Sequence, residues 1–257
     1  MGMAEAAEPY VVLRFYAELG DFLSADRRGA PFTAPLPPGA TVKHLIESAG
    51  VPHTEVELIL LNGNSVGFGK QPVSGDMVSV YPVFESLDVS PLVRVRESPL
   101  RRTRFVLDVH LGKLALILRL LGFDVLFPGD RDDAELARIS AGTGRILLTR
   151  DIGLLKRSVV DHGCYIRSDD PLRQAGEVLD RLDLRDSVEP FCRCVRCGGR
   201  LQEVDKEEIL HRLEPLTKRY YNDFRICPDC GQIYWRGSHY PALRKLLEDL
   251  GVEDREG

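Results

Sequence analysis

The sequence lacks the features that mark membrane and secreted proteins. No apolar run approaches the roughly 20 residues that a transmembrane helix needs, and residues 1–9 carry neither the basic start nor the apolar core of a signal peptide. Cysteine is scarce outside Cys-x-x-Cys pairs, so a disulfide framework is not indicated. We therefore expect a cytoplasmic protein with no membrane partner.

Four of the six cysteines stand in two Cys-x-x-Cys pairs, each followed by glycine. The pairs are Cys194 with Cys197 and Cys227 with Cys230. Two such knuckles are typical of a zinc ribbon, in which four thiolates complete a tetrahedral structural Zn²⁺ site with no open position. Disulfide bonds are the alternative. Cys192 is too close to Cys194 for the usual knuckle, and it either substitutes for a ligand or takes no part.

The length of 257 residues and the hydrophobic content of 44% suit two globular domains and a small module. The net charge of −5 is uneven, because residues 1–88 hold 5 basic and 11 acidic side chains. Residues 94–119 hold seven basic side chains against two acidic ones, a local footprint that suits a polyanion. A solvated linker is the alternative explanation of the same charges.

The N-terminal part predicts a small α+β domain of the β-grasp class, with the order strand, strand, helix, strand, strand. Thr41 suits the N-cap of a helix, and Asn62-Gly63 is a hairpin-turn signal. The runs Leu60-Leu61-Asn62-Gly63 and Gly75-Asp76-Met77-Val78-Ser79-Val80-Tyr81-Pro82 make residues 9–86 resemble the ubiquitin-like sulfur-carrier family. Those carriers end in a free Gly-Gly, whereas this chain continues through Val83. We therefore expect the domain to bind a protein partner or to steady the next domain.

Two apolar strands in the middle of the chain each lead to an aspartate, Asp108 and Asp151. A leucine-rich helix over residues 111–121 and an acidic helix start at Asp133 lie between them, so the repeated strand–helix–strand order predicts a parallel sheet. Ligands bind outside the carboxyl ends of such strands. Clustered carboxylates repel one another unless a cation lies between them, and oxygen ligands suit Mg²⁺ or Mn²⁺. A single aspartate at a strand end is more often only a turn or cap residue.

Five runs in this part of the chain form a wider pattern. They are Phe105-Val106-Leu107-Asp108-Val109, Leu111-Gly112-Lys113-Leu114, Leu118-Arg119-Leu120-Leu121-Gly122-Phe123-Asp124, Asp133 with Glu135-Leu136, and Arg145-Ile146-Leu147-Leu148-Thr149-Arg150-Asp151. Through these runs, residues 105–240 resemble the RNase domain named after the C-terminal part of the nematode Mut-seven exonuclease, a branch of the PIN-like nucleases. The resemblance implies a three-layer α/β fold and metal-dependent RNA cleavage. It implies that Asp108, Asp133 and Asp151 are the catalytic metal ligands.

Other acids and several bases flank these aspartates. Asp124 is a further candidate ligand or a turn residue, and Asp169-Asp170 offers a fourth acid of the PIN-like type. The bases that we expect to contact RNA phosphates, positioning RNA without reading its sequence, are Arg150, Arg119 and Lys113, with Arg145 also a candidate. The alternative is that Arg150 pairs with a neighbouring carboxylate and that the others face solvent.

Basic and aromatic residues also alternate around the cysteine module. Rings stack on unpaired bases and cations meet phosphates, so we expect Trp235, Arg236 and His239 to contact RNA. The alternative is that the aromatic side chains cover the small core of the ribbon, and we favour this for Tyr234.

The predicted domains are a disordered start (1–9), a ubiquitin-like β-grasp domain (10–88), a linker (89–103), a PIN-like RNase domain (104–188), and a zinc ribbon with a C-terminal helix (189–257). The main hypothesis is a metal-dependent ribonuclease with structural Zn²⁺ and catalytic Mg²⁺ or Mn²⁺. Its competitors are a non-catalytic RNA-binding or adaptor protein and a nuclease silenced by its own N-terminal domain.

Overall fold

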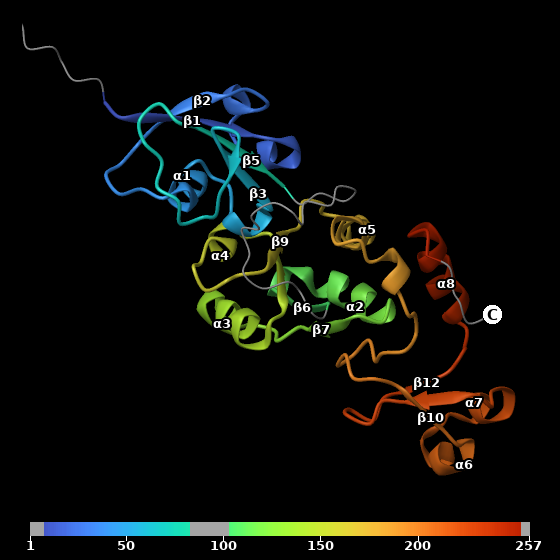
Figure 1. Cartoon of the computed structure of the whole chain (residues 1–257). Coiled ribbons are helices and arrows are strands. Elements are labelled where there is room, and N and C mark those ends of the chain that lie inside the picture. The colour runs from blue at the N-terminus through green and yellow to red at the C-terminus, as the bar shows by residue number, and fades with distance from the viewer. Residues whose placement is uncertain (1–7, 83–102, 253–257) are drawn as a thin grey trace, which may run out of the picture. The chain divides into compact units, whose positions relative to one another are not determined.

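The computed structural model describes residues 8–82 and 103–252 (Figure 1). The chain forms two compact units: unit 1 is residues 1–101 with 151–165, and unit 2 is residues 102–150 with 166–257. The predicted disordered start and the predicted linker lie outside the described residues, apart from the positions 8, 9 and 103. The same is true of Arg94, Arg96, Arg101 and Arg102, which account for much of the predicted basic stretch.

Unit 1 contains a β-grasp sheet of five strands in the order β2-β1-β5-β3-β4. The central strands β1 and β5 run parallel, whereas β1 with β2, β3 with β5 and β3 with β4 are antiparallel. The elements are β1 (Tyr10–Phe15), β2 (Phe32–Pro35), α1 (Val42–Ser48), β3 (Leu58–Leu61), β4 (Asn64–Ser65) and β5 (Met77–Tyr81), with 3-10 turns η1 (Ala17–Phe22), η2 (Ala25–Arg27) and η3 (His53–Glu55).

Local chemistry explains two of these boundaries. The helix α1 begins where Thr41 accepts a hydrogen bond from the His44 backbone N–H at 3.3 Å, so the predicted N-cap is confirmed. The β3–β4 hairpin turns at Asn62 and Gly63, which both have positive φ (49° and 83°), as a tight hairpin of this hand requires. Alternate strand residues and one face of α1 then close a core that includes Val11, Leu13, Ile46, Ile59, Val78 and Val80.

Unit 1 also contains a segment from far along the chain, residues 151–165. It holds the short helix α4 (Ile152–Leu155) and the strand β9 (Gly163–Tyr165). Leu154, Leu155 and Val160 are fully or almost fully buried. The grouping of this segment with the β-grasp sheet was not among the features that the sequence predicted.

The α/β part of unit 2 is built on a parallel sheet in which β6 lies between β7 and β8. Phe105, Val106 and Leu107 of β6 are completely buried, as expected for a central parallel strand. The elements are β6 (Arg104–Leu107), η4 (Val109–Leu111), α2 (Gly112–Leu120), β7 (Asp124–Leu126), α3 (Asp133–Thr143), β8 (Ile146–Thr149), α5 (Pro171–Arg181) and η5 (Arg185–Ser187).

The C-terminal part of unit 2 is a small antiparallel sheet in the order β10-β11-β12, followed by a helix. Ile209, Leu213, Phe224 and Ile233 form its own small core. The elements are β10 (Gln202–Val204), α6 (Lys206–Ile209), η6 (Leu210–Arg212), α7 (Pro215–Tyr220), β11 (Phe224–Ile226), β12 (Ile233–Tyr234) and α8 (Tyr240–Asp249). The predicted fold class is confirmed in its β-grasp sheet, its parallel-sheet α/β domain and its C-terminal cysteine module.

Candidate functional site

Asp108 lies where β6 and β8 end together. Leu107 pairs with Leu148, so the next residue of each strand, Asp108 and Thr149, stand side by side. The Thr149 hydroxyl donates to Oδ2 of Asp108, and the Arg150 N–H lies 3.4 Å from the same oxygen. Oδ1 accepts the His110 N–H at 2.8 Å, so the buried carboxylate (6% exposed) is held on both oxygens. The strand register therefore fixes this acid at the carboxyl edge of the sheet.

Asp151 and Asp133 each stand at the start of a helix. Asp151, which is exposed, is the N-cap of α4 and accepts the N–H groups of Gly153 and Leu154 at 2.6 and 3.1 Å. Asp133 is the first residue of α3 and is exposed, while the N-cap role belongs to Asp132, which accepts the Glu135 N–H at 2.7 Å. Of the three aspartates, Asp133 is the one whose carboxylate accepts no hydrogen bond from the described residues.

The three aspartates do not form a compact ligand group in the part of the chain that the structure describes. There, one set of at least three Cys, His, Asp or Glu residues has its ligand atoms within 4.8 Å of one another, and it consists of cysteines. Asp108 and Asp133 belong to unit 2, whereas Asp151 is the first residue of the inserted segment of unit 1.

Most of the remaining flanking charges have protein partners. Asp124 accepts a hydrogen bond from Arg145 Nη1 at 2.7 Å, and the same nitrogen donates to the carbonyl oxygens of Phe105 and Asp124. Asp124 and Arg145 therefore form a structural ion pair across the sheet. Arg150 pairs with the highly exposed Asp169, and Asp170 caps α5 by accepting the Arg173 N–H at 2.9 Å. Lys113 lies exposed on the first turn of α2.

Arg119 corrects one expectation from the sequence. Its side chain is buried, and its guanidinium donates to the carbonyl oxygens of Val125, Val195 and Arg196 at 2.9–3.2 Å. These contacts join α2 and β7 to the backbone of the first cysteine knuckle. Arg119 is thus a structural residue, and we leave it out of the RNA contacts.

Four sulfur atoms converge between the two knuckles. The Sγ atoms of Cys194 and Cys230 are 3.6 Å apart, those of Cys197 and Cys227 are 3.4 Å apart, and all four lie within 4.8 Å of one another. These separations exceed the roughly 2 Å of a disulfide bond and approach the edge of about 3.8 Å of a tetrahedron with Zn–S bonds of about 2.3 Å. The four-cysteine cluster therefore fits a structural zinc ion.

The backbone builds this cluster locally. In each knuckle, the N–H of the glycine that follows donates to the carbonyl of the first cysteine at 2.8 Å, and both glycines, Gly198 and Gly231, have positive φ (88° and 73°). Burial raises the pKa of Cys194, but hydrogen bonds from the Tyr234 hydroxyl and the Cys197 backbone outweigh it and bring the pKa to about 6. Cys192 lies outside the cluster, and its thiol is 3.9 Å from the Gly122 carbonyl oxygen.

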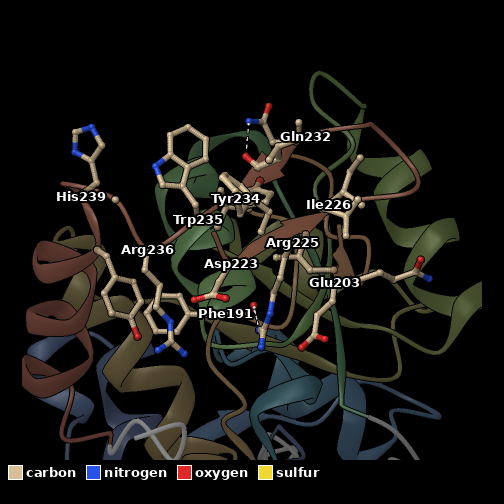
Figure 2. Close-up of a pocket in the computed structure, with 18 of the residues that line it drawn as sticks. Phe191, Glu203, Asp223, Arg225, Ile226, Gln232, Tyr234, Trp235, Arg236 and His239 are labelled. Carbon is tan, nitrogen blue, oxygen red and sulfur yellow. Dashed lines mark hydrogen bonds between the residues drawn. The ribbon is translucent and has the colours of Figure 1, made fainter. Parts of the chain in front are cut away.

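A groove of about 1430 Å³ runs beside the ribbon. Figure 2 shows its side chains coming from several segments: Phe191 before the first knuckle, Glu203 on β10, Arg225 on β11, and the run from Tyr234 to His239. Trp235 is 41% exposed, and one side of it is supported by Tyr221 and Phe224, with ring centroids at 6.5 and 6.3 Å. The groove thus presents an indole backed by other rings.

Gly237 shapes this end of the groove. A Cβ atom at this position would lie 2.6 Å from Nε1 of Trp235. The indole can therefore pack against the backbone here only because residue 237 has no side chain. Arg236 lies over the ring of Tyr240, with 5.4 Å from Cζ to the ring centroid. The lining also carries acids, including Glu203, Asp205 and Asp223, so its charge is mixed.

The model of the Mut7-C RNAse domain matches residues 103–247, more than half of the chain. The chain belongs to the Mut7-C RNAse domain family. A second family model, the Mut7-C ubiquitin domain, matches residues 8–88, so both predicted resemblances are confirmed. Among curated proteins no relative matches. A solved structure, the small archaeal modifier protein 1 of H. volcanii, aligns at 15% identity over 30% of this chain and 99% of its own, with a TM-score of 0.24.

Within the Mut7-C RNAse domain, sequence reasoning missed the roles that three residues play in the candidate sites. Thr149 orients Asp108, Tyr234 contacts the thiol of Cys194 at 3.1 Å, and Gly237 admits the indole of Trp235. Only Gly237 carried a signal in the sequence, since a glycine two residues after an aromatic residue leaves space beside that ring. No helix among the described residues has the length and apolarity to cross a membrane.

Proposed function

We propose that this member of the Mut7-C RNAse family is a metal-dependent ribonuclease that hydrolyses RNA phosphodiester bonds with Asp108, Asp133 and Asp151. The observation that carries the proposal is the family match over residues 103–247, in which Asp108 is buried at the joint end of β6 and β8. Asp151 follows Arg150, whose N–H lies near the Asp108 carboxylate. We place this activity in the cytoplasm, where the four thiolates stay reduced.

The oxygen donors of these aspartates suit Mg²⁺ or Mn²⁺. Such an ion, when bound, activates water and stabilises the oxygens of an in-line phosphoryl displacement. The protein orients the Asp108 carboxylate, since the hydrogen bonds from Thr149 and His110 hold both of its oxygens in place. Asp133 is exposed and is therefore open to an ion that arrives with RNA.

We expect Asp108→Asn and Asp133→Asn to lower cleavage of a single-stranded RNA by at least about 100-fold, because the ion is worth several kcal/mol in the transition state and about 1.4 kcal/mol corresponds to a factor of ten. RNA affinity and thermal unfolding should change little. Cleavage is followed with labelled RNA over a titration of Mg²⁺ and Mn²⁺.

Asp132→Asn is the matched control. It changes the adjacent carboxylate, which caps α3, and Asn is an equally good cap, so cleavage should persist. Undiminished cleavage by the Asp108→Asn, Asp133→Asn double variant in the presence of EDTA would falsify the proposal.

For RNA binding, we propose that the groove beside the ribbon holds unpaired nucleotides. Trp235 offers a supported ring face for stacking, and Arg236 and His239 stand on the same run of chain. The mixed charge of the lining favours base stacking over tracking of a duplex backbone. Arg150 and Lys113 remain the proposed phosphate contacts near the acids, and Arg150 would exchange its pairing with Asp169 for phosphate.

A second candidate function is non-catalytic RNA binding or an adaptor role, with the β-grasp domain docking a protein partner. It is favoured by the hydrogen bonds that already satisfy Asp108 and Asp151, and by the lack of a compact aspartate group among the described residues. This alternative predicts salt-dependent RNA binding without any cleavage product.

A further inference from the structure

The β-grasp domain and residues 151–165 are joined by buried polar contacts. Glu55, on η3, is 1% exposed, and its Oε1 accepts the backbone N–H of Tyr165 at 2.7 Å. His53, on the same turn, is 6% exposed, and its Nε2 lies 2.9 Å from the carbonyl oxygen of Val160. A carbonyl oxygen only accepts hydrogen bonds, so Nε2 is the donor. A carboxylate this deeply buried costs free energy unless it is paired.

Two further contacts extend this joint, which we call the η3 clasp. Lys156 Nζ donates to the carbonyl oxygen of Glu47 at 2.7 Å, and the rings of Phe22 and Tyr165 meet edge to face with centroids 5.3 Å apart. Figure 1 shows α4 and β9 next to the β-grasp domain with which they make these contacts. The clasp therefore holds the segment at its middle, near Lys156 and Val160, and at its end, Tyr165.

The clasped segment begins at Asp151. Its first turn, α4, starts from the Asp151 carboxylate itself, and Leu154 and Leu155 are buried in the same unit. The position of this carboxylate thus depends on how the segment is held, and residues 22, 47, 53 and 55 supply four of the contacts that hold it. A ubiquitin-like module that only docked other proteins would not need its buried carboxylate and imidazole to hydrogen-bond to residues 151–165.

We propose that the η3 clasp makes the β-grasp domain a positioning element of the nuclease, with Glu55 and His53 fixing the segment that carries Asp151. This inference rests on the proposed role of Asp151 as a metal ligand. It opposes a silencing role for the N-terminal domain, because loosening the clasp should weaken metal binding instead of releasing activity.

The test compares Glu55→Ala with Glu55→Gln in the full-length chain. Alanine leaves the Tyr165 N–H without its acceptor, whereas glutamine keeps an acceptor oxygen in place. We expect Glu55→Ala to raise the Mg²⁺ concentration for half-maximal cleavage, and the Mn²⁺ dissociation constant, by about tenfold, the scale seen for residues that orient metal ligands. The rate at saturating Mg²⁺ and the affinity for RNA should stay within about twofold of wild type.

Amide hydrogen exchange supplies a readout that does not depend on cleavage. Exchange in residues 151–165 should accelerate in Glu55→Ala, while exchange in residues 103–150 should not. Glu55→Gln should restore both exchange and metal affinity. Glu57→Gln, a change two residues along the same strand connection, is the matched control and should resemble wild type. Lys156→Met removes the hydrogen bond from Lys156 to the Glu47 carbonyl, and this variant replaces Glu55→Ala in the test if Glu55→Ala does not fold.

Wild-type metal affinity in both Glu55→Ala and Lys156→Met, or faster cleavage in either, would overturn the inference. Failure of the proposed function would give a different result, because the wild-type protein itself would then bind no Mn²⁺ and form no cleavage product. In that case Asp151 would not be a metal ligand, and the inference would fall with the proposed function.

Discussion

The cysteine cluster and the three candidate aspartates are two candidate metal sites in one chain, and they are built in different ways. Each knuckle sets its two thiols through one tight turn with its own backbone hydrogen bonds, and the four sulfurs already lie within 4.8 Å of one another. The aspartates come from the starts of three different helical segments. The carboxylates of Asp108 and Asp151 already accept hydrogen bonds from N–H and O–H groups of the protein.

This difference fits the separate roles that we propose for the two ions, one structural and one catalytic. A closed set of four thiolates leaves no position for water or substrate, so its ion contributes to folding. The proposed Mg²⁺ or Mn²⁺ ion would instead need open positions for water and phosphate oxygens, because Mg²⁺ keeps much of its hydration in proteins. The two sites should therefore fail differently when their ligands or ions are removed.

The largest expected effect is on the thiolate site. Cys227→Ser should lose the zinc ion and unfold the ribbon, because structural zinc contributes about 10–16 kcal/mol of apparent binding free energy in small modules. Zinc content by metal analysis and thermal unfolding of the full chain measure this loss. Cys192→Ser is the control, since its thiol lies outside the cluster, and it should retain zinc.

The chelator response should separate the two sites further. Brief EDTA treatment should stop cleavage and be reversed by added Mg²⁺, whereas the ribbon should stay folded on that timescale. A Cys227→Ser protein that kept its zinc and its unfolding temperature would contradict the structural role that we assign to the cysteine cluster.

A smaller effect is expected at Trp235, since the ribbon's groove is proposed to hold RNA without taking part in the chemistry. Trp235→Ala should weaken binding of single-stranded RNA by about 1–3 kcal/mol, the value of one stacked base, and should leave the cleavage rate at saturating RNA unchanged. Fluorescence anisotropy and single-turnover cleavage measure the two quantities.

Two companion variants make this result specific. Gly237→Ala should act in the same direction, because the new Cβ would displace the indole. Tyr220→Ala removes another ring that is 65% exposed but does not line the groove, and it should bind RNA like wild type. An equal loss in Tyr220→Ala would show that the groove has no special role.

The sequence allowed prediction of those features that short patterns encode. The two knuckles, the Thr41 cap and the Asn62-Gly63 turn each follow from residues close together along the chain. The parallel order of β6 and β8 follows from the repeated strand–helix–strand pattern. The burial of Arg119 could not be predicted in this way, because two of its three acceptor carbonyls lie on the first knuckle, 76 and 77 residues away. The η3 clasp joins residues about 110 apart, such as Glu55 and Tyr165, and periodicity carries no signal for such contacts.

The smallest expected effect concerns Asp169, which the sequence offered as a fourth acid and which the structure pairs with Arg150. As a metal ligand, it would cost cleavage when changed to Asn, as Asp108 does. As a mere charge partner of Arg150, its loss should leave the cleavage rate intact and tighten RNA binding by at most about fivefold, because exposed ion pairs are worth about 0–1 kcal/mol. Arg150→Gln should then weaken RNA binding. It should also reduce the slope of log binding constant against log salt concentration by about one, as expected for the loss of one phosphate contact. We expect the second pattern, since Asp169 is 88% exposed and its carboxylate contacts the guanidinium that we propose to meet phosphate. A loss of cleavage in Asp169→Asn that matches Asp108→Asn would instead add a ligand to the reactive site.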